Sequence, residues 1–410
     1  MAIKGPLTGV RILDLTVAHA GPYGAKLLGD LGAEVLKVEP PKYGDFTRNV
    51  GPFLGNPNNL ISTFILAMLR NRKSVALDLG TELGKQAFYD LVRVSDVVFS
   101  QQRAEVRKRI GMDYETLSQI NPRIISCLLT GFGSSGPYVN RPSYDDIAQA
   151  YSGMSSLCGE KGGPPIRSAV ATADIIAGLH AVVGIIACLY ERKSTGRGRQ
   201  IEVNLLDACL SALDTQIELY WLTGKVPEPQ GAKSPNIPLL GAFRTKDGHI
   251  MIGPSWPRIC RAVNREWMID DPRFNTPAKR YENKDELEKL IEEAIEKETT
   301  ETWEAIFEVE DIAFASINTL DKALADPQIV HNKPVITLKH PEYGEIKNID
   351  CPIKIAGGIE GKPLPPPMVG EHTEEVLREI LGYSDEKIRK LNEEVEKHSR
   401  ELESHVRRSI

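Results

Sequence analysis

One carboxylate stands directly before a long apolar run in the stretch SAVATADIIAGLHAVVGIIACLYERKSTGRG, which covers Ser168–Gly198. This residue, Asp174, suits two compatible roles. As the N-cap of the helix that the apolar run predicts, it would accept hydrogen bonds from backbone N–H groups of the first turn. Because a helix N-terminus favours the anionic form of a carboxylate, Asp174 is also a candidate nucleophile that attacks an activated carbonyl and forms a mixed anhydride. Carboxylates attack ordinary esters and amides poorly, so the predicted partner is an activated acyl group such as a thioester.

A second acidic segment lies upstream of Asp174, in RPSYDDIAQAYSGM. Tyr144, Asp145 and Asp146 open a helical pattern there, and capping that helix is one role for them. In the other role, Tyr144 or Asp145 lies beside Asp174 as a hydrogen-bonding or electrostatic partner. The spacing leaves both interpretations open.

Glycine-rich segments and basic residues supply further candidates. TGFGSSGP and EKGGPP predict turns, and glycine loops also serve as oxyanion donors or let flat ligands approach the backbone. Several basic residues are candidates for holding phosphate groups, although we expect most of them to be ordinary surface charges: Lys37, Lys42, Arg72, Lys73, Arg103, Arg107 and Arg109.

Strands and helices that must position these residues alternate from the start of the chain. A strand at Gly9–Thr16, a helix from about Pro22 to near Gly32 and a strand at Glu34–Val38 predict a right-handed parallel crossover. The alternation continues through KSVALDL, a helix in the segment that follows it, DVVFS, DYETLSQINP and RIISCLLTGF. The predicted fold class is α/β, with an open Rossmann-like sheet. Neither GxGxxG nor a P-loop motif is present, so a dinucleotide or P-loop site is disfavoured.

Later segments predict a second, smaller body. Helices at Tyr144–Met154 and Asp174–Lys193 are followed by a strand and a helix to about Leu222, and VPEPQGAKSPNIP then forms a linker. GAFRTKDGHIMIGP predicts a β-hairpin, and Asp285–Glu298 a helix with one apolar face. We expect a large domain at 1–222, a small α+β domain at 223–330 and a segment at 331–410 that returns to the large domain. The charged stretch Thr373–Arg408 predicts a solvated surface helix.

Composition narrows the function classes. The chain has 410 residues, a net charge of −6 and six scattered cysteines without CxxC spacing. Nothing in this charge favours nucleic acid or an anionic membrane as a partner, and the cysteines are expected to be reduced core thiols rather than metal ligands. The N-terminus lacks a signal-peptide pattern, and the apolar run Ile175–Tyr190 is shorter than the roughly 20 residues of a membrane span. The expected location is the cytoplasm, with no membrane.

Taken together, the segments resemble the class III CoA-transferase family, also called the CaiB/BaiF family. The resemblance runs through GVRILDLT, AGPYGAKLLGDLGAEVLKVEPP, NRKSVALDL, RIGMDYETLSQINPRIISCLLTGFGSSGPY, YDDIAQAYSGM, YERKSTGRGRQIEVNLLDA, AFRTKDGHI and PPPMVGEHTEEVL, in that order. It covers nearly the whole chain. It implies a homodimer of two interlocked rings, with each subunit threaded through its partner.

The resemblance also implies a mechanism. Asp174 matches the family's nucleophile and would form an aspartyl–acyl anhydride, then an aspartyl-CoA thioester, before CoA passes to an acceptor carboxylate. CoA and acyl-CoA are substrates, and no metal or tightly bound cofactor is implied. Tyr144 and Asp145 would assist Asp174. The residues that would bind the CoA substrate are His19, Ala20, Pro40, Lys42, Leu77, Gln101, Gln102, Arg103 and Arg109.

The chain departs from the family's pattern in two places. Ser100–Glu105 reads SQQRAE where the family usually has an ENFRPG-like stretch, so that part of the CoA pocket is expected to be reshaped. Formyl-CoA transferases carry Gln at the position of His19 and a glycine loop where this chain reads AKSPNIPLLG. Oxalate and formate are therefore disfavoured as substrates, and a small dicarboxylate such as succinate is the expected class.

Two alternatives stay open from the sequence. The related α-methylacyl-CoA racemases use a His–Asp pair, and Tyr144 stands where that His would fall. Tyr, with an ordinary pKa of about 10, is a poor base near neutral pH, which weakens the racemase interpretation. A catalytically silent CoA-binding protein is the other alternative, and the altered SQQRAE stretch is its main support.

Overall fold

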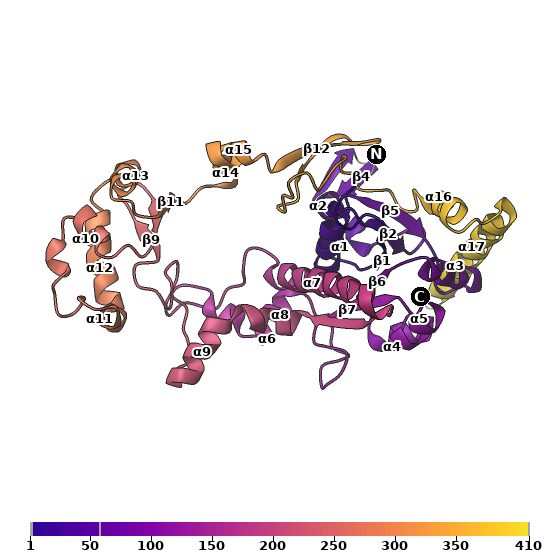
Figure 1. The fold of residues 1–410 in the computed structure, drawn as a ribbon, viewed down its shortest axis with the longest axis horizontal. Helices are drawn as coiled ribbons and strands as arrows, with labels where there is room; N and C mark the ends of the chain where they lie inside the picture. Colours follow the sequence, from indigo (N-terminus) through magenta and orange to yellow (C-terminus); the bar gives the residue numbers. More distant parts are fainter. Residues whose placement is uncertain (1–2, 57–58, 409–410) are drawn as a thin grey trace. The chain divides into compact units, whose positions relative to one another are not determined.

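A parallel sheet of six strands, in the order β5-β2-β1-β6-β7-β8, forms the centre of the computed structural model, which describes residues 3–56 and 59–408. Every neighbouring pair in this sheet is parallel (Figure 1), so the predicted α/β class is confirmed. The strands fall where the sequence predicts them: β1 Arg11–Leu15, β2 Glu34–Glu39, β5 Arg72–Ala76, β6 Val97–Ser100, β7 Ile125–Thr130 and β8 Gln200–Asn204.

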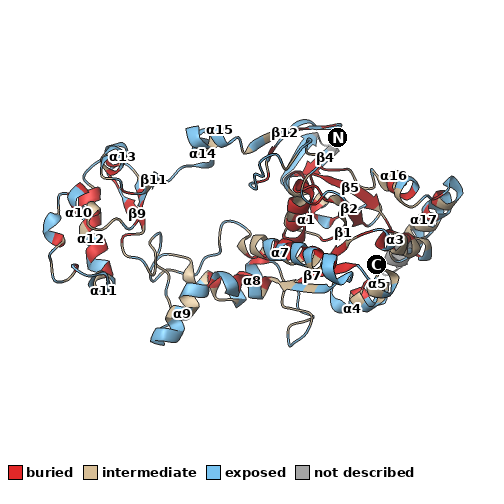
Figure 2. Ribbon diagram, in the orientation of Figure 1, coloured by how far each residue is buried: buried red, intermediate tan, exposed pale blue. Residues whose placement is uncertain are grey.

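Helices cover both faces of this sheet, as its continuously buried strands require. α3 (Glu82–Arg93) and α5 (Tyr114–Ile120) pack on one face of the sheet, to which β1 contributes the side chains of Leu13 and Leu15. The Thr81 side chain caps α3 by accepting a hydrogen bond from the Gly84 N–H. α1 (Ala20–Asp30) and α7 (Thr172–Thr195) cover the opposite face, and Figure 2 shows the buried residues concentrated between these layers.

α1 and α7 approach each other closely through glycine. A Cβ atom on Gly178 would lie 2.5 Å from the Ala20 carbonyl oxygen, and one on Gly24 would lie 2.9 Å from the Gly178 carbonyl oxygen. Larger residues at these positions would push the helices apart. Because the contact lies within the first two turns of both helices, it brings His19, which precedes α1, towards Asp174 in α7.

α7 is longer than the apolar run Ile175–Tyr190 that predicts it. Within the described residues it is the one helix long and apolar enough to cross a membrane, by length and composition only, although the apolar run had been expected to be too short. It packs against α1, α8 (Leu205–Ala212), β7 and β8. Ala177, Ala181 and Ile185 are buried in this packing.

The C-terminal stretch is helical and mostly exposed from 385 to 401, as its charge predicts, but it is not a single helix. It divides into α16 (Thr373–Glu375), a π-helical turn (Val376–Ile380) and α17 (Asp385–Arg408), with Gly382 at a φ of +65° between them. Ile388 and Leu391 are buried against the core that α3 and α5 share. A narrow apolar stripe thus anchors one face of an otherwise exposed, strongly charged helix.

The first compact unit contains further elements besides the parallel sheet and the helices that cover it. This unit comprises Met1–Ser152, Ala169–Ala212 and Pro334–Ile410. Its other elements are β3 Phe53–Asn56, β4 Asn59–Ser62, α2 Thr63–Met68, α4 Ala104–Ile110, α6 Asp145–Tyr151, β12 Val335–His340 and β13 Gly344–Ile349.

The second compact unit comprises Gly153–Ser168 and Leu213–Lys333. The predicted hairpin is confirmed as β9 and β10, and β11 adds a third antiparallel strand. The domain limits at 222/223 and 330/331 stay a prediction. The elements of this unit are α9 Asp214–Thr223, β9 Gly241–Arg244, β10 His249–Ile252, α10 Arg258–Ala262, α11 Pro277–Glu282, α12 Lys284–Ile295, α13 Thr300–Val309, β11 Phe314–Ser316, α14 Leu320–Ala325 and α15 Pro327–Asn332.

Candidate active site

Asp174 lies in the first turn of α7 but does not cap it. The helix begins at Thr172, and Ala171 occupies the N-cap position without a side-chain cap. Asp174 is therefore the third helical residue, and the predicted N-cap role is wrong. The side chain of Asp174 is 14% exposed and faces a pocket. Because the Asp174 carboxyl group does not serve as the N-cap, it is available to contact a ligand in this pocket.

Asp145 is the nearest acidic partner of Asp174. It is buried at the first position of α6, and its Oδ1 accepts a hydrogen bond of 3.1 Å from the Asp174 backbone N–H. Its Oδ2 accepts a second bond, of 2.5 Å, from Gln149 Nε2. Of the two neighbours that the sequence proposed, Asp145 holds the backbone of Asp174. Tyr144 precedes α6 with most of its side chain exposed, and it lines the same pocket.

Burial is the largest cause that raises the pKa of Asp174 to about 7, and the negative charges of Asp145 and Asp146 contribute in the same direction. The preference of a helix N-terminus for the anionic form of a carboxylate therefore does not decide this pKa. Desolvation and like charge outweigh the helix dipole, which acts on a carboxylate only through about half a unit charge. A carboxylate of raised pKa is a stronger base and nucleophile once it loses its proton.

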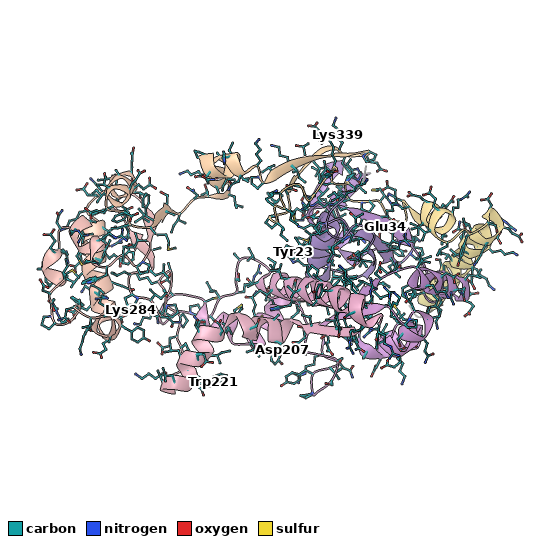
Figure 3. The ribbon with its side chains drawn as sticks, in the orientation of Figure 1. Tyr23, Glu34, Asp207, Trp221, Lys284 and Lys339 are labelled. Atoms are coloured by element: carbon teal, nitrogen blue, oxygen red, sulfur yellow. The ribbon has the colours of Figure 1, made fainter. Side chains whose placement is uncertain are left out.

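His19 faces Asp174 from the end of the β1–α1 loop. Its Nδ1 lies 3.9 Å from Asp174 Oδ2, and its ring stacks on Tyr23 with 6.2 Å between ring centroids. Burial and, next, the charge of Lys26 lower the pKa of His19, and the charge of Asp145 opposes them. His19 is therefore neutral near pH 7. Figure 3 labels Tyr23 on α1, where the stack forms.

A pocket of about 270 Å³ opens beside Asp174 at the carboxyl ends of the strands. Loops that follow β1, β6 and β7 form its walls, as expected for ligand sites in open α/β sheets. The glycine loop TGFGSSGP contributes Gly131 and Gly133, whereas EKGGPP belongs to the second unit. Further predicted residues on the wall are Gln101, Arg103 and Tyr144.

A second pocket, of about 330 Å³, lies where β1, β2 and β5 end. Four residues that the sequence assigned to CoA binding meet there: Pro40, Lys42, Leu77 and Gln102. Asp78 and Ser399 also line it, and Asp78 Oδ2 lies 2.6 Å from Nδ1 of His398 on α17. α17 therefore contributes to this wall, a role that the charged sequence of the helix did not reveal.

The altered stretch SQQRAE connects the two pockets. Gln101 lines the first and Gln102 the second. Gln101 Oε1 accepts a hydrogen bond of 2.7 Å from the Val17 N–H, and Gln102 Nε2 donates one of 3.0 Å to the Leu15 carbonyl. Both glutamines thus hold the end of β1, and the stretch that departs from the family pattern has a positioning role.

Two predicted residues lie elsewhere. Arg109 is exposed on α4 and lines neither pocket, and Ala20 is buried in the first turn of α1. The structure does not bring either side chain to Asp174.

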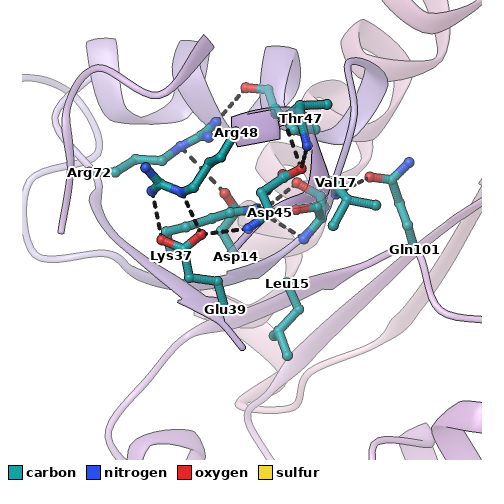
Figure 4. A network of polar contacts seen from close by, with 12 residues as sticks. Asp14, Leu15, Val17, Lys37, Glu39, Asp45, Thr47, Arg48, Arg72 and Gln101 are labelled. Carbon is teal, nitrogen blue, oxygen red and sulfur yellow. Dashed lines mark hydrogen bonds and ion pairs between the residues drawn. The ribbon is translucent and has the colours of Figure 1, made fainter. Parts of the chain in front are cut away.

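Three of the basic residues expected on the surface are buried. Arg107 donates to the Met112 carbonyl and to Ser126 Oγ, at 3.2 Å and 3.1 Å. Arg72 and Lys37 join a network of buried charges below the β1–α1 loop (Figure 4). The only sequence signal was that Lys37 interrupts the apolar run of β2; Arg72 opens β5 beside Lys73 and Ser74 and gives no such signal.

This paired-charge network consists of three carboxylates and three cations. The Asp14–Arg72 pair is 3.3 Å long, Asp45–Lys37 is 3.2 Å and Glu39–Arg48 is 2.7 Å (Figure 4). Lys37 also donates a hydrogen bond to the Thr16 carbonyl, and Asp14 Oδ1 accepts one of 2.9 Å from the Thr16 N–H. The network therefore positions the loop that ends at His19.

Comparisons with known proteins agree over most of the chain. The model of a family described as CoA-transferase family III matches residues 7–373. Succinyl-CoA:glutarate CoA-transferase of Homo sapiens is 36% identical over 94% of this chain and 88% of its own length. Succinate–glutarate CoA-transferase of Agrobacterium fabrum is 33% identical over 92% of this chain and 96% of its own.

Solved structures show the same fold. A CaiB/BaiF family protein from Brucella suis is 31% identical, with a TM-score of 0.79 over 92% of this chain and all (100%) of its own. A hypothetical protein from Mycobacterium tuberculosis is 28% identical, with a TM-score of 0.78 over 90% of this chain and 98% of its own.

Proposed function

The chain belongs to CoA-transferase family III and is a CoA-transferase, and we propose that it moves CoA between small carboxylic acids through covalent intermediates on Asp174. One observation carries this proposal. Asp174 presents a buried carboxyl group of raised pKa to a pocket at the carboxyl edge of the sheet. Within the described residues, His19 is the only basic side chain at ion-pair distance from it. The racemase and silent-protein alternatives have no comparable support.

In the proposed reaction, Asp174 attacks the carbonyl carbon of an acyl-CoA and expels the CoA thiolate, which leaves an aspartyl–acyl anhydride. The thiolate then attacks the aspartyl carbonyl and releases the donor acid. The acceptor carboxylate displaces CoA from the aspartyl thioester, and the thiolate finally attacks the acceptor's acyl group. Each step exchanges one activated acyl bond for another, so the energy of the thioester is retained.

The two pockets suit the two ends of acyl-CoA. We assign the nucleotide part to the pocket of Pro40, Lys42, Leu77 and Gln102, because Lys42 there offers a cation to phosphate. We assign the thioester to the pocket of Asp174. Gln101 and Arg103 on its wall would contact the intervening chain.

A small dicarboxylic acid is the proposed acceptor class. Arg141 lines the pocket of Asp174, and its guanidinium group stacks 4.0 Å from the Tyr138 ring centroid and donates 2.7 Å to the Tyr151 hydroxyl. This cation can bind a second carboxylate while the first meets Asp174. The relatives named for succinyl-CoA and glutarate support the same class.

An exposed apolar stripe supports the proposed homodimer. Leu179, Val183, Ile186 and Tyr190 occupy one side of α7, and Val183 is 66% exposed. In the second unit, Trp221 on α9 is also exposed (Figure 3). Large apolar surfaces of this kind mark protein interfaces. We propose that a second copy covers them in interlocked rings, which sedimentation would test. A cytoplasmic location remains a prediction.

The test of the function is transfer of CoA from succinyl-CoA to glutarate, followed by liquid chromatography and by mass spectrometry of the enzyme. We expect glutaryl-CoA, and an adduct on the Asp174 peptide that hydroxylamine releases. Asp174→Asn should abolish both. Asp214→Asn, which changes an exposed first-turn carboxylate of α9, is the matched control. Undiminished transfer by Asp174→Asn contradicts the proposal, as would solvent deuterium at Cα without an acceptor acid.

A further inference from the structure

His19 carries an unused polar atom at the centre of the site. Its Nδ1 is buried and has no hydrogen-bond partner among the residues that the structure describes, although it lies 3.9 Å from Asp174 Oδ2. A buried polar atom without a partner costs about 1–3 kcal/mol. Such an atom beside a candidate nucleophile suggests that its partner forms during the reaction. The gap is about 1 Å longer than a hydrogen bond, and catalytic hydrogen bonds are often long in empty sites.

The ring of His19 cannot move far from this position. Its backbone precedes α1, the Tyr23 ring stacks on it, and Gly24 and Gly178 fix the crossing of α1 on α7. Val17, two residues earlier, is held by Gln101.

Burial and the charges around Asp174 and His19 reverse the usual order of the two pKa values. Ordinarily a carboxyl group has a pKa of about 3.9 and an imidazole about 6.5. Here burial together with Asp145 and Asp146 of α6 raises the pKa of Asp174 to about 7, and burial with Lys26 of α1 lowers that of His19. Tyr23 of α1 and Cys209 of α8 also face the pair, and burial raises the pKa of both. Below about pH 7, Asp174 therefore holds a proton more readily than His19 does.

We propose that His19 is the proton partner of Asp174, whose Nδ1 accepts the carboxyl proton as Asp174 attacks the thioester. The inference rests on the proposed function and assigns His19 a task beyond contact with CoA. It makes His19 a residue that acts through Asp174, and it lets the enzyme work below the pH at which Asp174 would ionise.

The step balances in protons and electrons. Asp174 Oδ1 bonds to the thioester carbonyl carbon while the O–H bond at Oδ2 breaks. The proton goes to the lone pair of His19 Nδ1, and Oδ2 becomes the aspartyl carbonyl oxygen. The C–S bond breaks and sulfur leaves as the thiolate, so neutral Asp174 and neutral His19 become an anhydride, an imidazolium and a thiolate. The imidazolium then stabilises the thiolate until it attacks the aspartyl carbonyl.

The test compares the pH dependence of acylation in wild-type enzyme and in His19→Asn, whose amide fills the Nδ1 position without titrating. The rate of adduct formation from succinyl-CoA is measured in a single turnover, by rapid quench and mass spectrometry. At pH 8.5 the two rates should agree within about threefold, because Asp174 is already ionised. At pH 6 the variant should be about tenfold slower, since only about a tenth of Asp174 is ionised when its pKa is about 7.

His249→Asn is the matched control, because His249 lies exposed on β10, and its rates should equal those of wild type at every pH. A loss in His19→Asn that is the same at all pH values indicates a structural role and overturns the proposal, as does no loss at all. Absence of any adduct in wild type would instead refute the proposed function. The two failures are therefore distinguishable.

A second measurement needs no functional variant. In wild-type protein labelled with ¹⁵N-histidine, Nδ1 of His19 should resonate at pH 7.5 as an unprotonated ring nitrogen, because its pKa lies below 6.5. His19→Gln, a second substitution, identifies the signal by its disappearance if His19→Asn does not fold. A protonated Nδ1 at that pH in the empty enzyme overturns the proposal.

Discussion

Two clusters of buried carboxylates lie near the carboxyl edge of the same sheet and behave in opposite ways. In the paired-charge network, every carboxylate faces a lysine or arginine: Asp14 faces Arg72, Asp45 faces Lys37 and Glu39 faces Arg48. In the site of Asp174, two carboxylates share one region, and the only basic side chain at ion-pair distance from Asp174 within the described residues, His19, is uncharged near neutral pH. Asp174 is slightly more exposed, at 14%, than the carboxylates of the network. The presence or absence of a permanent cation separates a structural cluster from a reactive one.

The two clusters also depend on each other. Lys37 and Asp14 both bond to the backbone of Thr16, and the loop from Thr16 leads through Ala18, at a φ of +63°, to His19. The rigid network therefore sets the distance between His19 and Asp174. Substitutions that remove a cation from the paired-charge network, or a carboxylate from the site of Asp174, test this comparison.

The largest expected effect is on stability, from Arg72→Met. It leaves Asp14 buried without its cation, and breaking a buried pair costs about 3–5 kcal/mol. Urea unfolding would measure the loss. Arg199→Met is the control, because Arg199 forms an exposed pair with Glu191 whose loss should leave the free energy of unfolding almost unchanged. Equal losses in the two variants would contradict the structural role of the network.

Asp174→Asn should change stability in the opposite direction. Because the folded-state pKa of Asp174 is raised to about 7, ionising it opposes folding: the cost appears as pH rises from about 4 to 7 and is complete above 7. The variant should therefore melt at a higher temperature than wild type at pH 8 and at a similar temperature at pH 4. A lower melting temperature at pH 8 would show that the carboxylate is stabilised by partners.

Asp145→Asn should lower the pKa of Asp174. The charge of Asp145 raises that pKa, second only to burial, and the amide oxygen can still accept the Asp174 N–H. Infrared titration of the protonated carboxyl band that Asp174→Asn lacks should show a midpoint below 7. Asp146→Asn should shift it less, because Asp146 is the smaller cause. An unchanged midpoint in Asp145→Asn would mean that burial acts alone.

The smallest effect is expected at Asp78, a part-buried carboxylate of the second pocket. Its hydrogen bond to His398 is the main cause that raises the pKa of His398 above 6.5. The resulting stabilisation is fully present below pH 6.5 and disappears as pH rises through the raised pKa. His398→Gln should therefore lose stability at pH 6 and lose little at pH 9. A deficit that is equal at both pH values would rule out a charge effect.

Local sequence patterns predict the elements of the sheet well. Apolar runs and breakers locate all six parallel strands, and the apolar run after Asp174 locates α7. The same patterns identify Asp174 and Asp145 as candidate site residues, because a carboxylate in the first turn of a predicted helix can be recognised from the sequence. The start of α7 is missed by two residues, because Asp174 has the side chain of an N-cap, whereas Ala171, which occupies that position, does not.

The chain's sequence by itself determines which residues form strands and helices, and which carboxyl groups stand at their ends. Tertiary structure decides what each charge faces. Lys37 and Arg72 look like surface cations until β2 and β5 are buried beside β1. His19 meets Asp174 only because glycines let α1 and α7 touch. Secondary structure follows local periodicity, whereas a pKa depends on desolvation and on charges distant in sequence, which only the packed chain brings together.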